Sequence, residues 1–198
     1  MGFLDILLGR TRPAQPDLDR LFGLPSAAVT LEAAAGFTPT GTGAVCFASV
    51  EGQAFAEAHR EVQALLDADA GRTGPPVEVA RDEYGYSWLV SRRAPDDLPA
   101  LVSDLHAVNS ALEGSGFGPQ LLCSVAGFET GPAAAGEQRL GLVYLYKRGT
   151  FYPFAPVPGG NQRRDNALEL QVKAALADDL RIEQDLSRWF PIWGAPGL

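Results

Sequence analysis

Two pairs of strand-like segments in this chain are joined by connections that are too short for anything but a hairpin. Residues 77–81 and 86–90 alternate apolar and polar side chains on either side of the tetrapeptide DEYG, and residues 140–147 reach 151–155 through a tight Arg-Gly turn. Antiparallel strands can be joined by such turns, whereas parallel neighbours need a crossover of a dozen or more residues. The sequence therefore predicts a mostly antiparallel sheet.

Helical periodicity marks three further segments, at residues 52–69, 98–112 and 163–177. The cleanest apolar stripe belongs to the second of them and consists of Leu98, Leu101, Val102, Leu105, Val108 and Leu112. Three helices with one apolar side each are expected to pack on one face of the sheet. We therefore expect an α+β fold with a mostly antiparallel sheet and about three helices on one face.

The first fifty residues give weaker signals. They predict a brief helix at 18–24 that ends before Pro25, a weak strand at 29–33, a loop over 36–43, and a strand at 45–49. Two more strands are expected at 120–128 and 140–147. Pro153 limits the strand at 151–155 to a sheet edge.

Both ends of the chain are apolar. Residues 1–16 form an apolar stub and a Pro-rich link, and residues 17–198 are expected to form a single α+β domain that includes the aromatic C-terminal tail. The side chains that could dock elsewhere are Phe3, Leu4, Leu7 and Leu8 in the stub and Trp189, Phe190 and Trp193 in the tail. Packing on the domain and docking on a partner or a membrane interface are both open for them. We expect packing for the tail and docking for the stub.

A basic, aromatic segment lies at residues 139–164, which contain no Asp or Glu although the chain has a net charge of −8. Lys147 and Arg148 lie at the predicted hairpin tip and Arg163 and Arg164 at the predicted start of the third helix, with Tyr152 between the two pairs. Structural ion pairing and a surface for an anionic partner are the two interpretations. The acidic chain as a whole, with a pI near 4.7, argues against nucleic-acid binding.

The residues that most often carry chemistry are few. His59 and His106 lie at the borders of apolar stripes, and no Cys, Asp or Glu cluster completes a metal site around either. Cys46 and Cys123 lie in apolar strand-like runs and read as small core residues of a cytosolic protein, with a disulfide as the alternative. No nucleophile elbow or phosphate loop is present. We predict no enzymatic activity, no cofactor and no metal.

No segment approaches the roughly 20 apolar residues that span a bilayer, and the N-terminus lacks the features of a secretory signal. The expected location is therefore the cytoplasm, with peripheral contact at the inner face of the membrane as a further expectation from the apolar ends.

Several strings of the chain are familiar together: MGFLDILLGRT, YGYSWLV, LHAVNSALEGSGFGPQLLC, LVYLYKRGTFYPFAP, RRDNALELQV and DLSRWFPIWGAPGL. They resemble the actinobacterial and archaeal PspA-associated protein PspAB family, and the likeness covers almost the full chain. The resemblance implies a protein partner, either a PspA-like protein or one in a membrane-protease context, and a role in an envelope stress response. It supplies no catalytic residues.

The residues and the resemblance together suggest a non-enzymatic cytosolic adaptor or regulatory binding module of a PspA-type response. One alternative is a small enzyme or ligand-binding protein for an anionic small molecule beside the four basic residues. Another, by fold analogy alone, is a dimeric secretion-chaperone-like protein. A deep pocket lined by the basic residues favours the ligand-binding protein, and a flat patch favours the adaptor.

Overall fold

The fold is built on a six-stranded antiparallel sheet. The computed structural model describes residues 16–48, 53–67, 75–131, 137–159 and 162–198. Its strands are β1 (Phe37–Ala48), β2 (Glu78–Arg81), β3 (Tyr86–Arg92), β4 (Leu121–Thr130), β5 (Arg139–Leu145) and β6 (Thr150–Phe154). Their order is β2-β3-β1-β4-β5-β6, and each neighbouring pair is antiparallel. The α+β class expected from the hairpins is confirmed.

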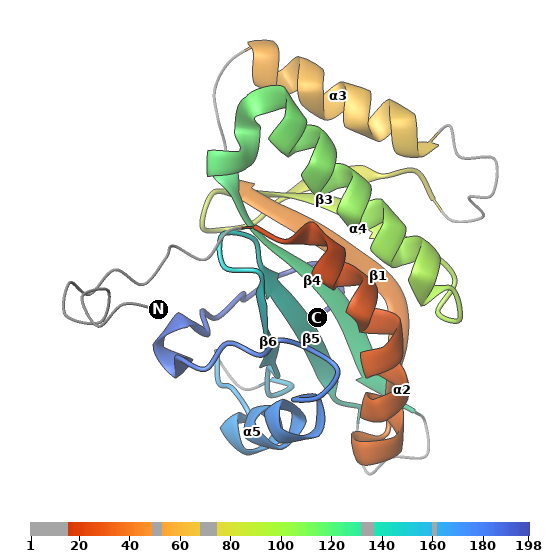
Figure 1. The fold of residues 1–198 in the computed structure, drawn as a ribbon, viewed down its shortest axis with the longest axis vertical. Helices are drawn as coiled ribbons and strands as arrows, with labels where there is room; N and C mark the ends of the chain where they lie inside the picture. The colour runs from red at the N-terminus through yellow and green to blue at the C-terminus, as the bar shows by residue number, and fades with distance from the viewer. Residues whose placement is uncertain (1–15, 49–52, 68–74, 132–136, 160–161) are drawn as a thin grey trace, which may run out of the picture.

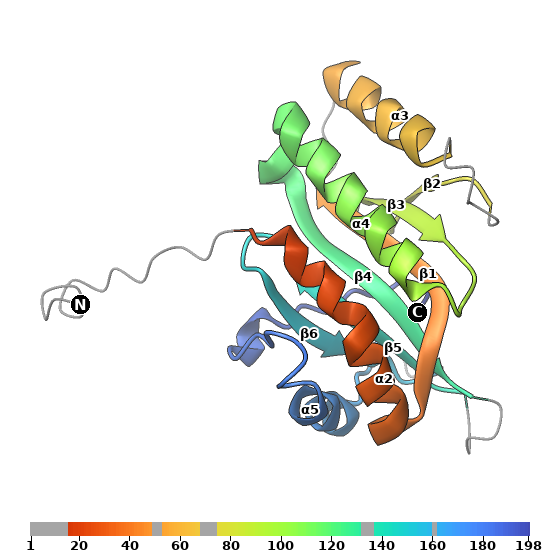
Figure 2. The ribbon, with the colours of Figure 1, turned by 45° about the vertical axis from the view of Figure 1, so that its right-hand side comes forward.

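The helices lie on one side of this sheet. They are α2 (Leu24–Ala35), α3 (Gln53–Asp67), α4 (Leu98–Leu112) and α5 (Asn166–Ala175), so the described part of the chain has one helix more than expected. Figures 1 and 2 show α2 and α4 crossing the same face of the sheet, with α5 beside the lower end of α2. Short helical turns cover Leu18–Gly23 (η1), Glu113–Phe117 (η2), Gly118–Gln120 (η3) and Leu186–Arg188 (η4).

Helix α4 has the apolar stripe that the sequence predicts, and this stripe is buried. Leu101 and Leu105 are almost fully enclosed. The side chain of Asp97 caps the helix start by accepting from the Ala100 amide at 3.2 Å. The carboxylate of Asp104 is also buried under the helix, where the Arg93 guanidinium binds it at 2.7 Å. The helix is therefore fixed by apolar packing and by one buried ion pair.

The weak strand predicted at residues 29–33 is wrong, because these residues form the second half of α2. Pro25 lies in the first turn of that helix, where its missing N–H costs nothing and its fixed φ suits the helix start. The helix then continues through an Ala-rich run and ends at Gly36, whose φ of 72° is easily adopted only by glycine. The brief helix predicted before Pro25 is confirmed as η1 (Leu18–Gly23), which leads directly into α2.

The loop predicted at residues 36–43 is wrong as well. Strand β1 begins at Phe37 and pairs with β4 from Phe37 opposite Thr130. The register shifts between Pro39 and Gly43, which is where a proline without an N–H fits into a strand. Turn-type residues here mark an irregular part of a long central strand.

Helix α5 starts later than predicted. The side chain of Asp165 caps it by accepting from the Leu168 amide at 3.0 Å, so Arg163 and Arg164 precede the helix. Glu169 of the helix forms an ion pair with Arg164 at 2.9 Å, although Lys173 lies one turn farther along. The Lys173 ammonium lies 6.0 Å from the centre of the Trp189 ring instead.

The face of the sheet away from the helices is covered in part by the C-terminal tail, residues 183–198. Trp189 stacks on Tyr152 with ring centres 6.0 Å apart, and Trp193 meets Phe154 edge-on at 4.9 Å. Farther along, the tail lies against two glycines that pair across β4 and β5, Gly127 and Gly141. A side chain at either position would press on the last two residues of the chain. At the opposite end of this face, tail residues 190–193 cover the sheet only in part.

Candidate functional site

A cavity of about 860 Å³ lies on the face away from the helices, where the tail covers the sheet only in part. Alternate residues of each strand point to this face. On β1, Gly43 approaches Leu101 of α4, so Cys46 points the opposite way, into the cavity. The cavity is lined by side chains of β1 and β3–β6, by the two hairpin turns and by tail residues Arg188 to Trp193.

The two cysteines of the chain form part of the cavity floor. Cys46 and Cys123 are partners in the β1–β4 register, and both are free and buried, with 4% and 7% of their surface exposed. The hydrogen bond with the Cys123 thiol, followed by burial, raises the pKa of the Cys46 thiol far above its usual range. A thiol held in the protonated form is a weak nucleophile, so Cys46 contributes an uncharged surface to the floor.

One wall of the cavity comes from the β2–β3 turn. The carboxylate of Asp82 accepts hydrogen bonds from the indole of Trp88 and from the amides of Tyr84 and Tyr86, each at 2.9 Å. These bonds order the turn and hold the Trp88 ring in the wall. Asp82, the one carboxylate in the lining, therefore stabilises its own hairpin.

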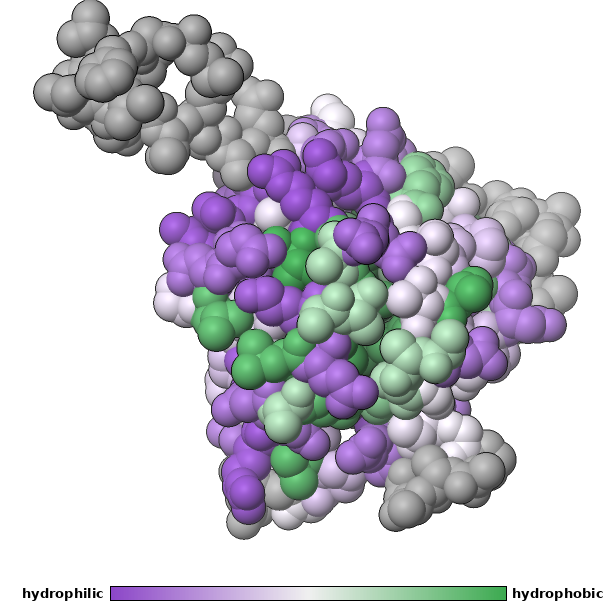
Figure 3. Space-filling view, turned by 60° about the horizontal axis from the view of Figure 1, so that its bottom comes forward, coloured by the Kyte–Doolittle hydropathy of each residue, from purple (hydrophilic) through white to green (hydrophobic). Residues whose placement is uncertain are grey.

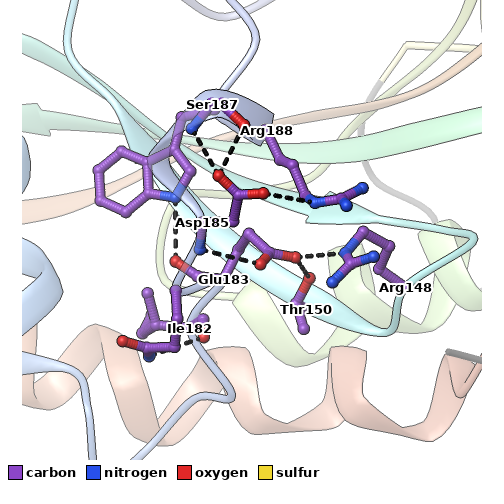
Figure 4. A network of polar contacts seen from close by, with 9 residues as sticks. Arg148, Thr150, Ile182, Glu183, Asp185, Ser187 and Arg188 are labelled. Atoms are coloured by element: carbon purple, nitrogen blue, oxygen red, sulfur yellow. Dashed lines mark hydrogen bonds and ion pairs between the residues drawn. The ribbon is translucent and has the colours of Figure 1, made fainter. Parts of the chain in front are cut away.

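The opposite wall comes from the β5–β6 turn and the tail, and a buried carboxylate joins them. Glu183 accepts from Arg148 Nε at 2.5 Å, from the Thr150 hydroxyl at 3.0 Å and from the Asp185 amide at 3.1 Å (Figure 4). Burial acts to raise the pKa of Glu183, but these hydrogen bonds outweigh it and the pKa lies below its usual range. Glu183 is therefore ionised at neutral pH and ties the tail to the hairpin.

Three cations line this second wall. Arg148 and Arg188 each use Nε to bind a carboxylate, Glu183 and Asp185 respectively, and Figure 4 shows both guanidinium groups on one side of the 183–185 segment. Their terminal nitrogens have no other partner within the described part of the chain. The same holds for the exposed ammonium of Lys147. The wall thus presents several free N–H donors to the cavity.

The other two predicted basic residues lie elsewhere. A bridge between Pro156 and Arg164 places them at the far end of β6 from the Lys147–Arg148 turn. Arg164 is half-buried: it binds Glu169, donates to the Trp189 carbonyl at 2.5 Å and lies 5.1 Å from the Phe154 ring centre. Arg163 is exposed. The four basic residues therefore form two separate pairs, and only the first pair lines the cavity.

Tyr152 lies between these pairs and is almost fully buried. Its hydroxyl donates to the Phe190 carbonyl at 2.7 Å, and burial raises the pKa of the phenol well above its usual range. The residue remains a neutral hydrogen-bond donor that fixes the tail at the edge of the cavity.

With this geometry in place, comparison with known proteins identifies the family. The chain matches PspAB, PspA associated protein B, over residues 1–197. It belongs to the PspAB family. The family's name indicates an association with PspA, and no curated protein and no solved structure matches the chain.

The tail residues of this PspAB protein occupy three different environments. Trp189 is buried, Trp193 is half-buried, and Phe190 keeps 59% of its surface exposed at the mouth of the cavity. The stub residues Phe3, Leu4, Leu7 and Leu8 lie outside the described residues. Within the tail, Phe190 is therefore the aromatic side chain most available to a partner.

A second apolar area lies at the end of the molecule that carries α5 and the C-terminal end of α2. Figure 3 shows hydrophobic residues gathered in the middle of that face, with hydrophilic ones around them. Leu170 of α5 is exposed and borders a hollow of about 430 Å³. This hollow has fewer aromatic side chains and half the volume of the first cavity.

The described residues contain no group of three or more His, Cys, Asp or Glu side chains that could hold a metal ion. His106 lies 3.4 Å from Asp19 and packs against the ring of Phe22, whereas the side chain of His59 is outside the described residues. Among the helices that are described, none is both long and apolar enough to cross a membrane.

Of the residues singled out from the sequence, five line the cavity: Lys147, Arg148, Tyr152, Phe190 and Trp193. The sequence did not single out the rest of the lining, including Asp82, Trp88, both cysteines and Arg188. The alternation of Tyr86, Trp88 and Val90 placed Trp88 and Tyr86 on one face. The register of β1 decides which face of the sheet the helices leave free. This register could not be predicted, because residues 36–43 were expected to form a loop.

Proposed function

We propose that this PspAB protein is a non-enzymatic binding module of a PspA-type envelope stress response, and that it binds through the cavity between the two hairpin turns and the tail. The observation that carries this proposal is the wall of free cationic donors beside an aromatic, apolar cavity. Such combinations of a concave apolar surface and a few convergent polar groups are typical of binding sites. The protonated thiol of Cys46 is a weak nucleophile, and the Asp82 carboxylate is engaged by three hydrogen bonds within its own hairpin.

The mouth of the cavity suits a protein partner in particular. Phe190 is exposed there, and Lys147 lies in the lining next to Arg148. Aromatic and arginine side chains near a pocket contribute most of the energy in many interfaces. As an adaptor, the protein would present this mouth to PspA, in the cytoplasm or at the inner face of the membrane.

A second candidate function is the binding of an anionic small molecule. Lys147 and Arg148 line a cavity and do not lie on a flat patch, and this favours a ligand over a protein surface alone. The two functions are compatible because the mouth and the interior of the cavity are different surfaces.

The adaptor is tested by measuring the affinity of the purified protein for PspA of the same organism. Phe190→Ala and Lys147→Glu should each weaken binding about tenfold or more. The matched control is Phe22→Ala, which removes a ring of similar exposure, 51%, from the helix side of the molecule. Equal effects of Phe190→Ala and Phe22→Ala, or no effect of either cavity substitution, would rule out the cavity mouth as the PspA site.

The N-terminal stub provides a separate test. Deletion of residues 2–8 should leave the melting temperature nearly unchanged and should reduce association with PspA or with liposomes, because a Pro-rich link separates these apolar residues from the domain. A large loss of stability on deletion would make the stub part of the fold, and unchanged association would rule out docking through it.

A further inference from the structure

We infer that the cavity holds a single-chain anionic amphiphile, a long-chain carboxylate such as a free fatty acid. This inference rests on the proposed function only in taking the same cavity as a binding site, and it does not require PspA. It follows from three properties of the lining: its apolar interior, its one-sided charge and its partial closure by the tail.

The interior is apolar and large enough for an extended chain. The floor consists of Cys46, Cys123, Leu122 and Leu145, and the rings of Trp88 and Trp193 border it. A volume of about 860 Å³ lies within the range of small-molecule sites, roughly 300–1,000 Å³. The transfer of an alkyl chain from water to this surface is favourable and requires no polar contact.

The charge is arranged for one anionic group at one side. Arg148 and Arg188 provide free terminal N–H donors on the wall next to β6, and a carboxylate can accept two parallel N–H donors from one guanidinium. Because Glu183 and Asp185 pair with these two arginines, Lys147 supplies the net positive charge of the wall. The negative charge of Asp82 lies on the opposite wall and would repel a carboxylate from that side. The head group is therefore directed to the Lys147 wall and the alkyl chain toward the cysteine floor.

The tail makes the site a cavity. Without residues 190–193 the same strands would present an open apolar surface, which suits a protein face better than a thin alkyl chain. Hydrogen bonds to Tyr152 and Glu183 hold the tail, which covers one side of the apolar floor. The opening of the cavity lies beside Phe190. A partly enclosed apolar cavity with a cationic rim fits a single alkyl chain with a charged end.

The test uses the full-length protein, stripped of bound lipid, with palmitate as the probe and hexadecanol as its neutral analogue. Binding is followed by tryptophan fluorescence, since Trp88 and Trp193 line the cavity. It is followed independently by alkylation of the two cysteines with N-ethylmaleimide, because the chain has no others. Palmitate should quench or shift the fluorescence and slow the alkylation of Cys46 and Cys123, and hexadecanol should bind about tenfold more weakly.

Two substitutions separate the head-group wall from the interior. Lys147→Gln should weaken palmitate about tenfold and leave hexadecanol unchanged, and Arg163→Gln is the matched control, an exposed cation at the far end of β6. Leu145→Trp should reduce the binding of both compounds by filling the interior. If this last variant fails to fold, the Lys147→Gln comparison still decides the question.

Several outcomes would overturn the inference. These are equal affinity for palmitate and hexadecanol, no protection of the thiols, protection by acetate or inorganic phosphate as strong as by palmitate, or binding only to phosphatidylglycerol vesicles. The first two deny a seated carboxylate, the third indicates a simple anion site, and the last a membrane surface. Palmitate binding without PspA binding would refute the adaptor alone, and the reverse result would refute this inference alone.

Discussion

The two faces of the sheet are covered by different means, and the 860 Å³ cavity lies on the face that the tail covers. On one face, α2 and α4 pack a continuous apolar layer in which Leu101 and Leu105 are enclosed. On the other face an irregular tail packs two tryptophans on β6 and its last residues on two glycines. A helix presents a regular stripe that closes a face completely, whereas the tail covers only the strands it crosses. A binding site can form where that cover ends.

The largest effect is expected from the anchor of the tail. Trp189→Ala removes a buried ring that stacks on Tyr152 and whose indole donates to the Glu183 carbonyl at 3.0 Å. We expect a loss of about 3–5 kcal/mol in the free energy of unfolding, measured in urea, together with loss of palmitate binding. Phe190→Ala, one residue away but exposed, should cost less than about 1 kcal/mol. Similar costs for both would show that the tail is not anchored through Trp189.

The corresponding substitution on the helix face is Leu105→Ala. It should cost about 2–5 kcal/mol through the cavity that it leaves in the core under α4. Alkylation of the cysteines and palmitate binding should stay unchanged at temperatures where the variant is folded, because the sheet separates Leu105 from the site. A change in thiol reactivity there would mean that the two faces are coupled.

The close contact between tail and sheet is tested at Gly127. A β-carbon there would lie 2.9 Å from the Gly197 carbonyl oxygen and 2.8 Å from the Thr40 hydroxyl, so backbone must move. Gly127→Ala should therefore cost about 1–3 kcal/mol in thermal or urea unfolding. Gly114→Ala is the control, because a β-carbon at that position meets nothing within 4 Å. Equal stability of the two variants would contradict the packing of the tail on β4.

The smallest effect concerns pH and two buried glutamates. The folded-state pKa of Glu183 is lowered, so its contribution to stability is present above about 4.5 and is lost as the pH falls below that value. Burial raises the pKa of Glu169 despite the hydrogen bond from Arg164, so stability from this group falls as the pH rises from 4.5 toward its folded pKa. Unfolding curves of Glu183→Gln and Glu169→Gln should therefore deviate from the wild-type pH profile with opposite slopes.

The regular elements could be predicted because their local signals agree with their environment. The stripe around Leu105 and the turns at 82–85 and 148–149 encode helix and hairpins within a few residues of sequence. The predictions at 29–33 and 36–43 are wrong because a proline is compatible with a loop, with the first turn of a helix and with an irregular part of a strand. Only the packing around Pro25 and Pro39 decides among these conformations.

The cavity was beyond such reasoning. It is formed by side chains from Cys46 to Trp193 that meet only once the sheet order and the path of the tail are known. The tail's path depends on small residues at two paired positions, Gly127 and Gly141, which read in the sequence as ordinary strand glycines. The two basic pairs lie in one short stretch of the sequence, but the structure places them at opposite ends of β6.

A chain terminus usually frays independently of the domain it belongs to. Here one guanidinium, that of Arg164, touches helix α5 through Glu169, the tail through the Trp189 carbonyl, and strand β6 through the Phe154 ring. The tail cannot detach without breaking contacts that also hold the start of α5. Native-state hydrogen exchange should therefore show the Trp189 amide opening together with those of α5 and β6, as one cooperative unit rather than as a loose end.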